Sequence, residues 1–62
     1  MNLKLKLKIL EKYPRQGDLA RETGISEPLI SRIVHERRDP FPGEAQAIAK
    51  ALGCKEEEIF PE

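Results

Sequence analysis

The chain has 62 residues, which is enough for one small domain, and we expect residues 1–62 to fold as a single unit. Eleven Lys and Arg residues balance eleven Asp and Glu residues, and a formal net charge of zero at first argues against a nucleic-acid partner. The charges are unevenly distributed, however, because residues 1–38 hold nine basic and five acidic side chains, net +4, whereas residues 39–62 are net −4. A domain polarised in this way can present one basic face to DNA.

Composition also excludes several classes of protein. Cys54 is the only cysteine and the sequence shows no secretory leader, which fits a reducing, cytoplasmic setting. Apolar runs are only two or three residues long, whereas a membrane span needs roughly 20 apolar residues. One histidine, His35, and one cysteine are too few to hold a metal, and no catalytic triad, activated nucleophile or glycine-rich phosphate loop can be assembled. We therefore expect no enzymatic activity, metal, cofactor, small-molecule ligand or membrane contact.

The opening segment, MNLKLKLKIL, admits two secondary-structure interpretations. Its strict alternation of leucine and lysine is typical of a half-buried strand, but Leu5, Ile9 and Tyr13 recur at helical spacing. Strand signals are nearly absent after residue 10, so a strand here would leave its backbone groups unpaired. We therefore expect a helix over residues 3–12, although extended structure at residues 2–6 remains an alternative.

This first helix would turn a stripe through Leu5 and Ile9 inward, with Leu10 on its flank. Such a stripe leaves Leu7 exposed, which makes the helix a candidate contact surface. Its lysines do not share one polar face, as a helix that lies on a membrane requires, so a membrane-surface peptide is not expected.

Two short helices are predicted next, at residues 16–23 and 27–36. The first of them stops at Gly24, and the second begins after Ser26 as N-cap, with Pro28 in its first turn, where the missing N–H costs nothing. Two short helices that meet at a tight turn form a helix-turn-helix, in which the second helix can enter a DNA major groove. The buried face of this second helix is expected to hold Ile30, Ile33 and Val34.

Two further helices complete an all-α architecture. Two prolines and a glycine break the chain over residues 37–43, and a helix is expected at 43–52, with Gly53 just past its end. A last helix is expected at 55–60, with Cys54 at its cap position. The inward side chains of these two helices are predicted to be Ile48, Leu52, Ile59 and Phe60.

Two longer stretches of the sequence resemble a known family. QGDLARETGISEPLISRIVHERRDP resembles the helix-turn-helix of the Cro and phage-repressor (lambda-repressor-like) family, with its Gln-x-x-Leu-Ala, Gly-Ile-Ser and Ile-Ser-Arg-Ile elements. AIAKALGCKEEEIF resembles the ending of the same family. The resemblance covers nearly the whole chain, and it implies a compact five-helix DNA-binding domain with its helix-turn-helix at about residues 16–36.

The resemblance also implies which side chains contact the bases of DNA. Arg32 can bind guanine O6 and N7 through two hydrogen bonds, and Glu27 can accept one from cytosine N4–H₂. A glutamate in the first helical turn is equally favoured by the helix dipole, so a purely structural role for Glu27 remains open. The implied base contacts are Glu27, Pro28, Ser31 and Arg32.

Further residues are expected at the DNA backbone. The resemblance implies phosphate contacts for Gln16 at the start of its helix and for Arg37 and Arg38 in the loop after residue 36. Arg15 stands where many relatives have a Ser or Thr cap, and it cannot cap a helix through its side chain. We therefore expect Arg15 to reach a phosphate as well.

Two other departures from the family pattern concern the scaffold. Many relatives have glycine after the recognition helix, where the chain becomes left-handed, but this chain has Glu36, so the turn either differs or carries strain. Some relatives join the first helix to the end of the third with a buried Arg–Glu pair; here the corresponding residues are Ile9 and Val34, and we expect them to touch.

These observations predict a sequence-specific double-stranded DNA-binding protein that acts as a small transcriptional repressor. A homodimer is expected by analogy, through the C-terminal helix near Phe60. The alternative is an antitoxin-like or anti-repressor interaction module on the same fold with weak DNA affinity, and the net charge of zero keeps it open.

Overall fold

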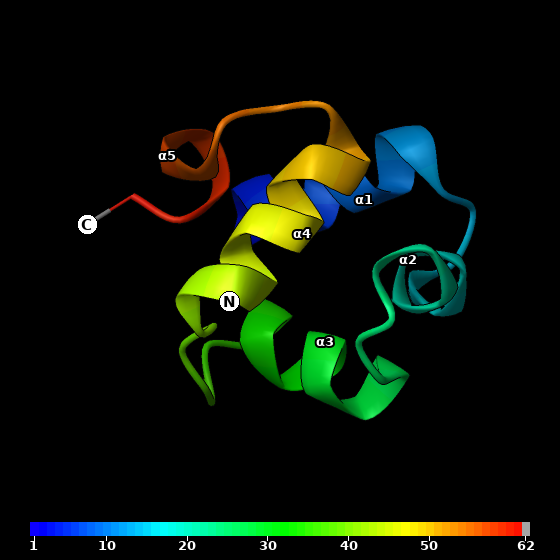
Figure 1. Cartoon of the computed structure of the whole chain (residues 1–62), viewed down its shortest axis with the longest axis horizontal. Coiled ribbons are helices and arrows are strands. Elements are labelled where there is room, and N and C mark those ends of the chain that lie inside the picture. Colours follow the sequence, from blue (N-terminus) through cyan, green and yellow to red (C-terminus); the bar gives the residue numbers. More distant parts are fainter. Residues whose placement is uncertain (62) are drawn as a thin grey trace.

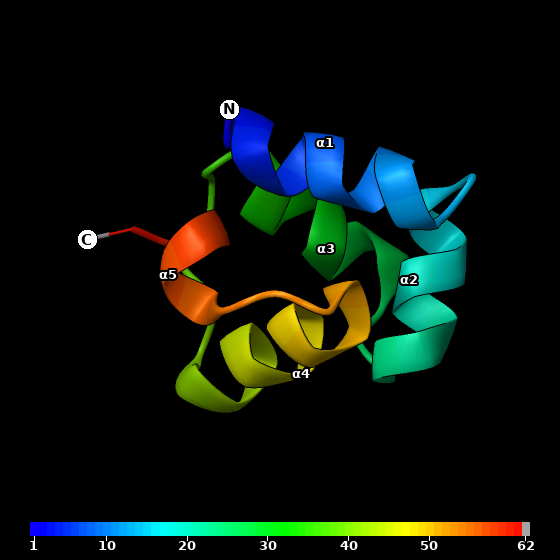
Figure 2. The same ribbon diagram turned by 90° about the horizontal axis from the view of Figure 1, so that it is seen from above.

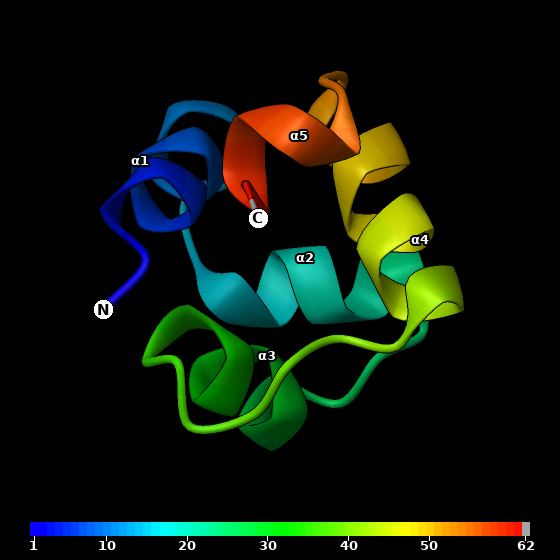
Figure 3. The same cartoon turned by 90° about the vertical axis from the view of Figure 1, so that its left-hand side faces the viewer.

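The computed structural model describes residues 1–61, and this part of the chain consists of five helices and no strands. In Figure 2, α1 and α4 lie on opposite sides of the molecule, while α2 and α5 lie at its two ends. α3 lies on the side of the molecule away from α5 (Figure 1, Figure 3). The fold is therefore all-α, as predicted. The helices are α1 (Leu3–Lys12), α2 (Gln16–Thr23), α3 (Glu27–Val34), α4 (Pro42–Leu52) and α5 (Glu56–Ile59).

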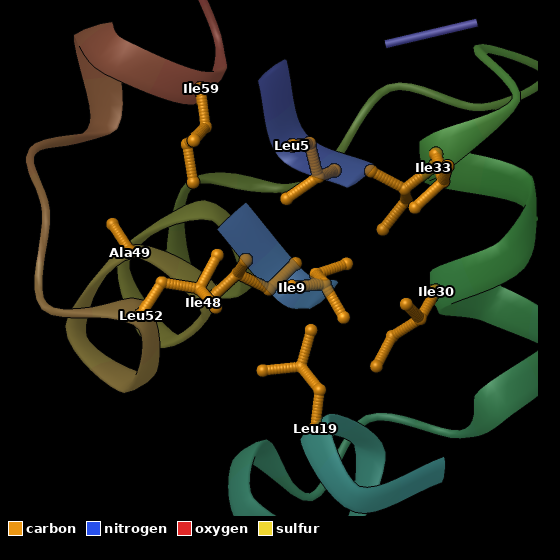
Figure 4. Close-up of a cluster of buried hydrophobic side chains, with 10 residues drawn as sticks. Leu5, Ile9, Leu19, Ile30, Ile33, Ile48, Ala49, Leu52 and Ile59 are labelled. Atoms are coloured by element: carbon orange, nitrogen blue, oxygen red, sulfur yellow. The ribbon is translucent and has the colours of Figure 1, made fainter. Parts of the chain in front are cut away.

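One hydrophobic core joins all five helices. Figure 4 shows side chains from every helix pointing toward a common centre. Ile9 and Val34 both belong to this core and are 1% and 0% exposed, although their direct contact stays a prediction. Because each helix contributes to the same core, none is expected to be stable apart from the others. The core residues are Leu5, Ile9, Leu19, Ile30, Ile33, Val34, Ile48, Ala49, Leu52 and Ile59.

The first helix begins at Leu3, so the extended alternative for residues 2–6 is wrong. Asn2 is its N-cap, and Asn2 Oδ1 accepts a hydrogen bond from the backbone N–H of Leu5 at 3.1 Å. The backbone N–H of Asn2 donates to Val34 O at 2.7 Å, and its Nδ2 donates to Ile59 O at 2.6 Å. Asn2 thus connects the start of α1 to the ends of α3 and α5, a role that was not predicted from the sequence.

The exposed side of α1 differs in part from expectation. Leu7 is 58% exposed, as expected, but Leu10 is also exposed, at 57%, rather than lying on the flank of the buried stripe. Leu5 and Ile9 are the buried residues of α1, and position 10 lies outside the stripe that they form. None of the five helices is long and apolar enough to be a membrane span.

The third helix ends at Val34, before the predicted end at residue 36. The backbone becomes left-handed at Glu36, with φ 60°, which is incompatible with a continuing α-helix. The N–H of Glu36 donates to Ile33 O at 3.1 Å, and the N–H of Arg37 donates to Arg32 O at 2.9 Å. The last carbonyls of α3 therefore remain hydrogen-bonded. The chain therefore forms the left-handed turn that the resemblance led us to expect here, but with glutamate in place of glycine.

The last two helices also need correction at their boundaries. α4 begins at Pro42 and is followed by left-handed Gly53, φ 69°, close to expectation. α5 is only one turn long, and Lys55 rather than Cys54 is its N-cap residue. Lys55 has no side-chain acceptor, so the cap consists of its backbone N–H donating to Glu58 Oε2 at 2.8 Å. Cys54 lies half-buried against the core instead.

Candidate nucleic-acid interface

The turn between α2 and α3 depends on Gly24. This residue is left-handed, with φ 76°, and its N–H donates to Ala20 O at 2.9 Å. A Cβ at position 24 would meet no atom within 4 Å, so glycine is required by the backbone conformation and not by lack of space. The hydroxyl of Thr23 donates to Leu19 O at 2.9 Å and accepts from the N–H of Ile25 at 3.2 Å. Backbone and hydroxyl together thus set the direction in which α3 leaves α2.

The start of α3 presents polar groups to solvent. Ser26 is the N-cap residue by backbone conformation, but its side chain makes no capping hydrogen bond. Glu27 and Pro28 follow in the first turn, and all three residues are exposed. The first N–H groups of α3 are therefore not satisfied by a side-chain cap, so they are open to water or to an acceptor on a ligand.

Four of the predicted site residues meet at one place. Gln16 at the start of α2 lies beside Glu27, Pro28 and Ser31 of α3, and the four side chains line a single open hollow on the surface. The N-termini of α2 and α3 thus converge, although they are separated by most of the helix-turn-helix in sequence. A predicted phosphate contact is thereby brought next to three predicted base contacts.

The carboxylate of Glu27 lies over the first turn of α2. A Cβ placed on Gly17 would be 3.2 Å from Glu27 Oε2, so this acidic group lies close to the N-terminal backbone of the neighbouring helix. A helix N-terminus attracts anions because its first N–H groups and its dipole are positive. Glu27 therefore carries negative charge at the helix end where a DNA phosphate would also be attracted.

Three of the predicted DNA contacts are exposed arginines without an ion-pair partner. Arg15, Arg32 and Arg37 are all exposed, and none of them takes part in an ion pair within residues 1–61. Arg15 is the residue before α2, and it makes no side-chain capping bond there, as expected. Arg32 lies on α3 and Arg37 three residues beyond its end, so two of these exposed positive charges lie on or near α3.

Arg38, in contrast, has a partner within the protein. Its Nη1 donates to Glu44 Oε1 at 2.8 Å and its Nη2 to Glu44 Oε2 at 3.4 Å, with the guanidinium 4.5 Å from the ring centre of Phe41. Glu44 Oε1 also accepts the N–H of Phe41 at 2.9 Å. The Arg38 guanidinium, and after it the Phe41 N–H, lower the pKa of the Glu44 carboxyl. These contacts hold the loop between α3 and α4; the phosphate contact of Arg38 remains a prediction.

Other chemically distinctive residues do not add to this site. Burial, and secondarily the charge of Glu58, raise the pKa of the Cys54 thiol, which keeps it in its unreactive protonated form. His35 is exposed just after α3. Within residues 1–61 no group of three His, Cys, Asp or Glu side chains is placed to hold a metal ion.

Comparison with known proteins gives one match. A family model described as a Cro/C1-type HTH DNA-binding domain matches residues 4–61, which is nearly the whole chain. Searches of curated proteins and of solved structures found no match.

Proposed function

The chain belongs to the Cro/C1-type helix-turn-helix DNA-binding domains, and from that membership we propose that it is a small transcriptional repressor that recognises a specific double-stranded DNA sequence. The observation that carries this proposal is the convergence of Gln16 with Glu27, Pro28 and Ser31 in one open hollow. Exposed arginines lie at the start of α2, on α3 and just beyond it. Base-reading and backbone-binding groups are thereby available on one surface.

Base recognition would come from α3. Arg32 is exposed and unpaired, so it can donate two parallel hydrogen bonds to guanine O6 and N7 in the major groove. Glu27 can accept from cytosine N4–H₂, and Pro28 offers only apolar contact, such as to a thymine methyl group. Ser31 is half-buried, and its hydroxyl can donate or accept at a base edge.

Affinity would come largely from the phosphates. Gln16 and Arg15 lie at the start of α2, and Arg37 lies just beyond α3, so these residues can contact the backbone on both sides of the recognition helix. Arg38 contributes by holding the loop that carries Arg37, through its ion pair with Glu44. Repression would then follow from occupation of the operator.

Two variants test this division of roles. After selection of bound sequences from a random pool, Arg32→Ala is expected to relax the preference at one base position and to cost about 1–3 kcal/mol on the selected site. Arg37→Ala is expected to weaken binding to all sequences alike and to lower the slope of log affinity against log salt by about one. Loss of specificity in Arg37→Ala, or none in Arg32→Ala, would contradict the assignment.

Glu27 gives a third test because its charge opposes the phosphates. Glu27→Gln removes that charge while keeping the size of the side chain, so binding to random DNA should strengthen by a few-fold. Discrimination at one base pair should fall at the same time if the carboxylate accepts from cytosine. Unchanged affinity for random DNA would show that Glu27 lies away from the DNA.

The alternative is an antitoxin-like or anti-repressor module with weak DNA affinity. The exposed leucines of α1 favour a protein contact of some kind, so this alternative rests on a definite observation. A salt titration separates the two functions, because a phosphate-binding protein must lose affinity steeply as salt rises. Binding that does not respond to salt, or no binding at low salt, would favour the interaction module.

Dimerisation is also part of the proposal, because two half-sites one DNA turn apart supply affinity that one small module lacks. By analogy, the contact is expected near Phe60. In the structure, however, Phe60 is half-buried against the core, and the largest exposed apolar side chains lie elsewhere.

A further inference from the structure

The exposed face of α1 carries an unpartnered row of leucines. Leu3, Leu7 and Leu10 are 62%, 58% and 57% exposed, whereas Leu5 and Ile9 on the other side of the helix are fully buried. The three exposed leucines are separated by four and then three residues, so they fall on one stripe of the helix. Surface leucines are common one at a time, but three in a row on one helix indicate a contact surface.

We propose that α1 pairs with α1 of a second copy of this chain in an antiparallel two-helix contact. The alternating spacing of four and three residues is the spacing of a coiled-coil seam, in which the helices pack through apolar side chains at these positions. In an antiparallel pair, Leu7 of each molecule packs beside Leu10 of the other. This contact forms in the free protein and does not depend on DNA binding.

Charge next to the leucine stripe is complementary to a second copy. Lys4 and Glu11 are seven residues apart and therefore lie on the same side of the stripe, where both border a surface hollow beside Leu7. In the antiparallel arrangement the start of one helix lies beside the end of the other, so Lys4 of each molecule meets Glu11 of its partner. Neither residue has an ion-pair partner within residues 1–61, so both are available for this contact.

The direction of pairing follows from the charge along α1. Lys4, Lys6 and Lys8 lie in its first part, whereas its last turn holds Glu11 and Lys12 and is neutral. A parallel pair sets the two lysine-rich parts side by side, whereas an antiparallel pair sets each against the end that holds Glu11. Antiparallel helices also place the positive end of one dipole beside the negative end of the other.

The contact is small, and this limits its strength. α1 has ten residues, and a helix of that length is about 15 Å long. Stable interfaces bury about 800 Å² on each partner, which is more than one such helix face provides. The dimer is therefore weak, with a dissociation constant on the order of micromolar to millimolar.

Sedimentation equilibrium of the whole chain without DNA, in a concentration series that reaches millimolar, tests the pairing. Leu7→Glu is expected to weaken association about tenfold or more, because it places a charge in the apolar stripe. Lys4→Glu and Glu11→Lys should each weaken it about fivefold, since each sets like charges against one another. The double variant Lys4→Glu/Glu11→Lys restores opposite charges in the antiparallel dimer and should regain nearly the wild-type association.

Phe41→Ser is a matched control, because Phe41 is 64% exposed but lies in the loop before α4. It should associate like the wild type, and circular dichroism should show that every variant keeps its helical content. A monomer at all concentrations, association that Leu7→Glu leaves intact, or a double variant no better than the single ones would overturn the proposal. Because no DNA is present, these results are separate from any failure of DNA binding.

Discussion

The two ends of the recognition helix α3 are positioned in different ways. Before its start, the chain turns at Gly24, with φ 76°, a conformation that glycine adopts without strain. After its end, the chain makes a similar left-handed turn at Glu36, with φ 60°, which costs a residue with a Cβ about 1–2 kcal/mol. The turn before α3 therefore forms without strain because Gly24 has no Cβ. The strained turn after α3 must be stabilised by other contacts.

One backbone hydrogen bond and one ion pair supply those contacts at the end of α3. The N–H of Asn2 donates to Val34 O, and Arg38 pairs with Glu44 across the loop that follows. The start of α3, which we propose faces the DNA bases, has no side-chain cap, so its first polar groups stay available. The opposite end is held by the backbone N–H of Asn2, just before α1, and by the ion pair of Arg38 with Glu44 of α4.

The largest effect is expected for Asn2→Ala. The variant loses the N-cap of α1 and the hydrogen bond to Ile59 O, so the free energy of unfolding should fall by about 2 kcal/mol. Chemical denaturation monitored by circular dichroism measures this change. Asn2→Asp is the control, because it keeps the capping oxygen but loses the Nδ2 donor, and its loss should be about half as large. Because the variant keeps the backbone N–H that donates to Val34 O, equal stability of Asn2→Ala and the wild type would mean that the two side-chain hydrogen bonds of Asn2 do not stabilise the fold.

The next largest effect is expected for Gly24→Ala, which tests the other end of α3. The added Cβ meets no atom within 4 Å, but the alanine must keep the left-handed backbone conformation of Gly24. We therefore expect the free energy of unfolding to fall by about 1–2 kcal/mol, measured by thermal or chemical unfolding. Gly43→Ala in the first turn of α4 is the matched control. A Cβ at position 43 also meets no atom within 4 Å, and Gly43 does not have a left-handed backbone conformation. This variant should therefore stabilise the fold slightly or leave its stability unchanged. Equal losses in both variants would show that conformation at position 24 is not the cause.

These two residues also show what the sequence could and could not predict. Gly24 was predicted because a helix-ending glycine is a local signal, read from a few neighbouring residues. Asn2 was not predicted, because its hydrogen bonds reach Val34 and Ile59, which are distant in sequence. The ion pair of Arg38 with Glu44 was missed for a related reason. It spans a loop whose path cannot be derived from composition, so Arg38 was grouped with Arg37.

Within the candidate site, the sequence predicts where the helices lie better than it predicts which side chains from different helices approach one another. The bounds of α1 and α2 and the buried stripe of α3 followed from periodicity and end signals. The approach of Glu27 to the first turn of α2 depends on the angle between two helices, which no local pattern encodes. Leu10 was misplaced because a stripe through Leu5 and Ile9 has two possible flanks, and only tertiary packing decides which of them is covered.

A smaller effect, of opposite sign, is expected for Glu36→Gly. Glycine relieves the left-handed strain but increases the freedom of the unfolded chain, so the net gain in stability should be about 0.5–1 kcal/mol. The Glu36 carboxylate lies 3.4 Å from the amine of Met1, but this exposed contact contributes little. Glu36→Ala separates the two causes, because it removes the carboxylate and keeps the strain. A gain in Glu36→Ala as large as in Glu36→Gly would assign the effect to charge.

The smallest effect concerns the ion pair beyond the end of α3, and it appears only on acidification. Arg38 lowers the pKa of Glu44 in the folded protein, so the pair stabilises the fold above the ordinary pKa of a glutamate. This contribution is lost as the pH falls from the ordinary pKa of the unfolded glutamate through the lower pKa of folded Glu44. In that range the unfolded chain binds the proton more readily than the folded protein. Glu44→Gln should therefore lower the melting temperature at neutral pH and show a weaker further decrease in acid than the wild type. Glu22→Gln, at an exposed position on α2, should keep the wild-type dependence. If Glu44→Gln also keeps the wild-type pH dependence, the ion pair does not stabilise the fold. The end of α3 is then held by the backbone N–H of Asn2 alone, and the two ends of the helix differ less than the structure indicates.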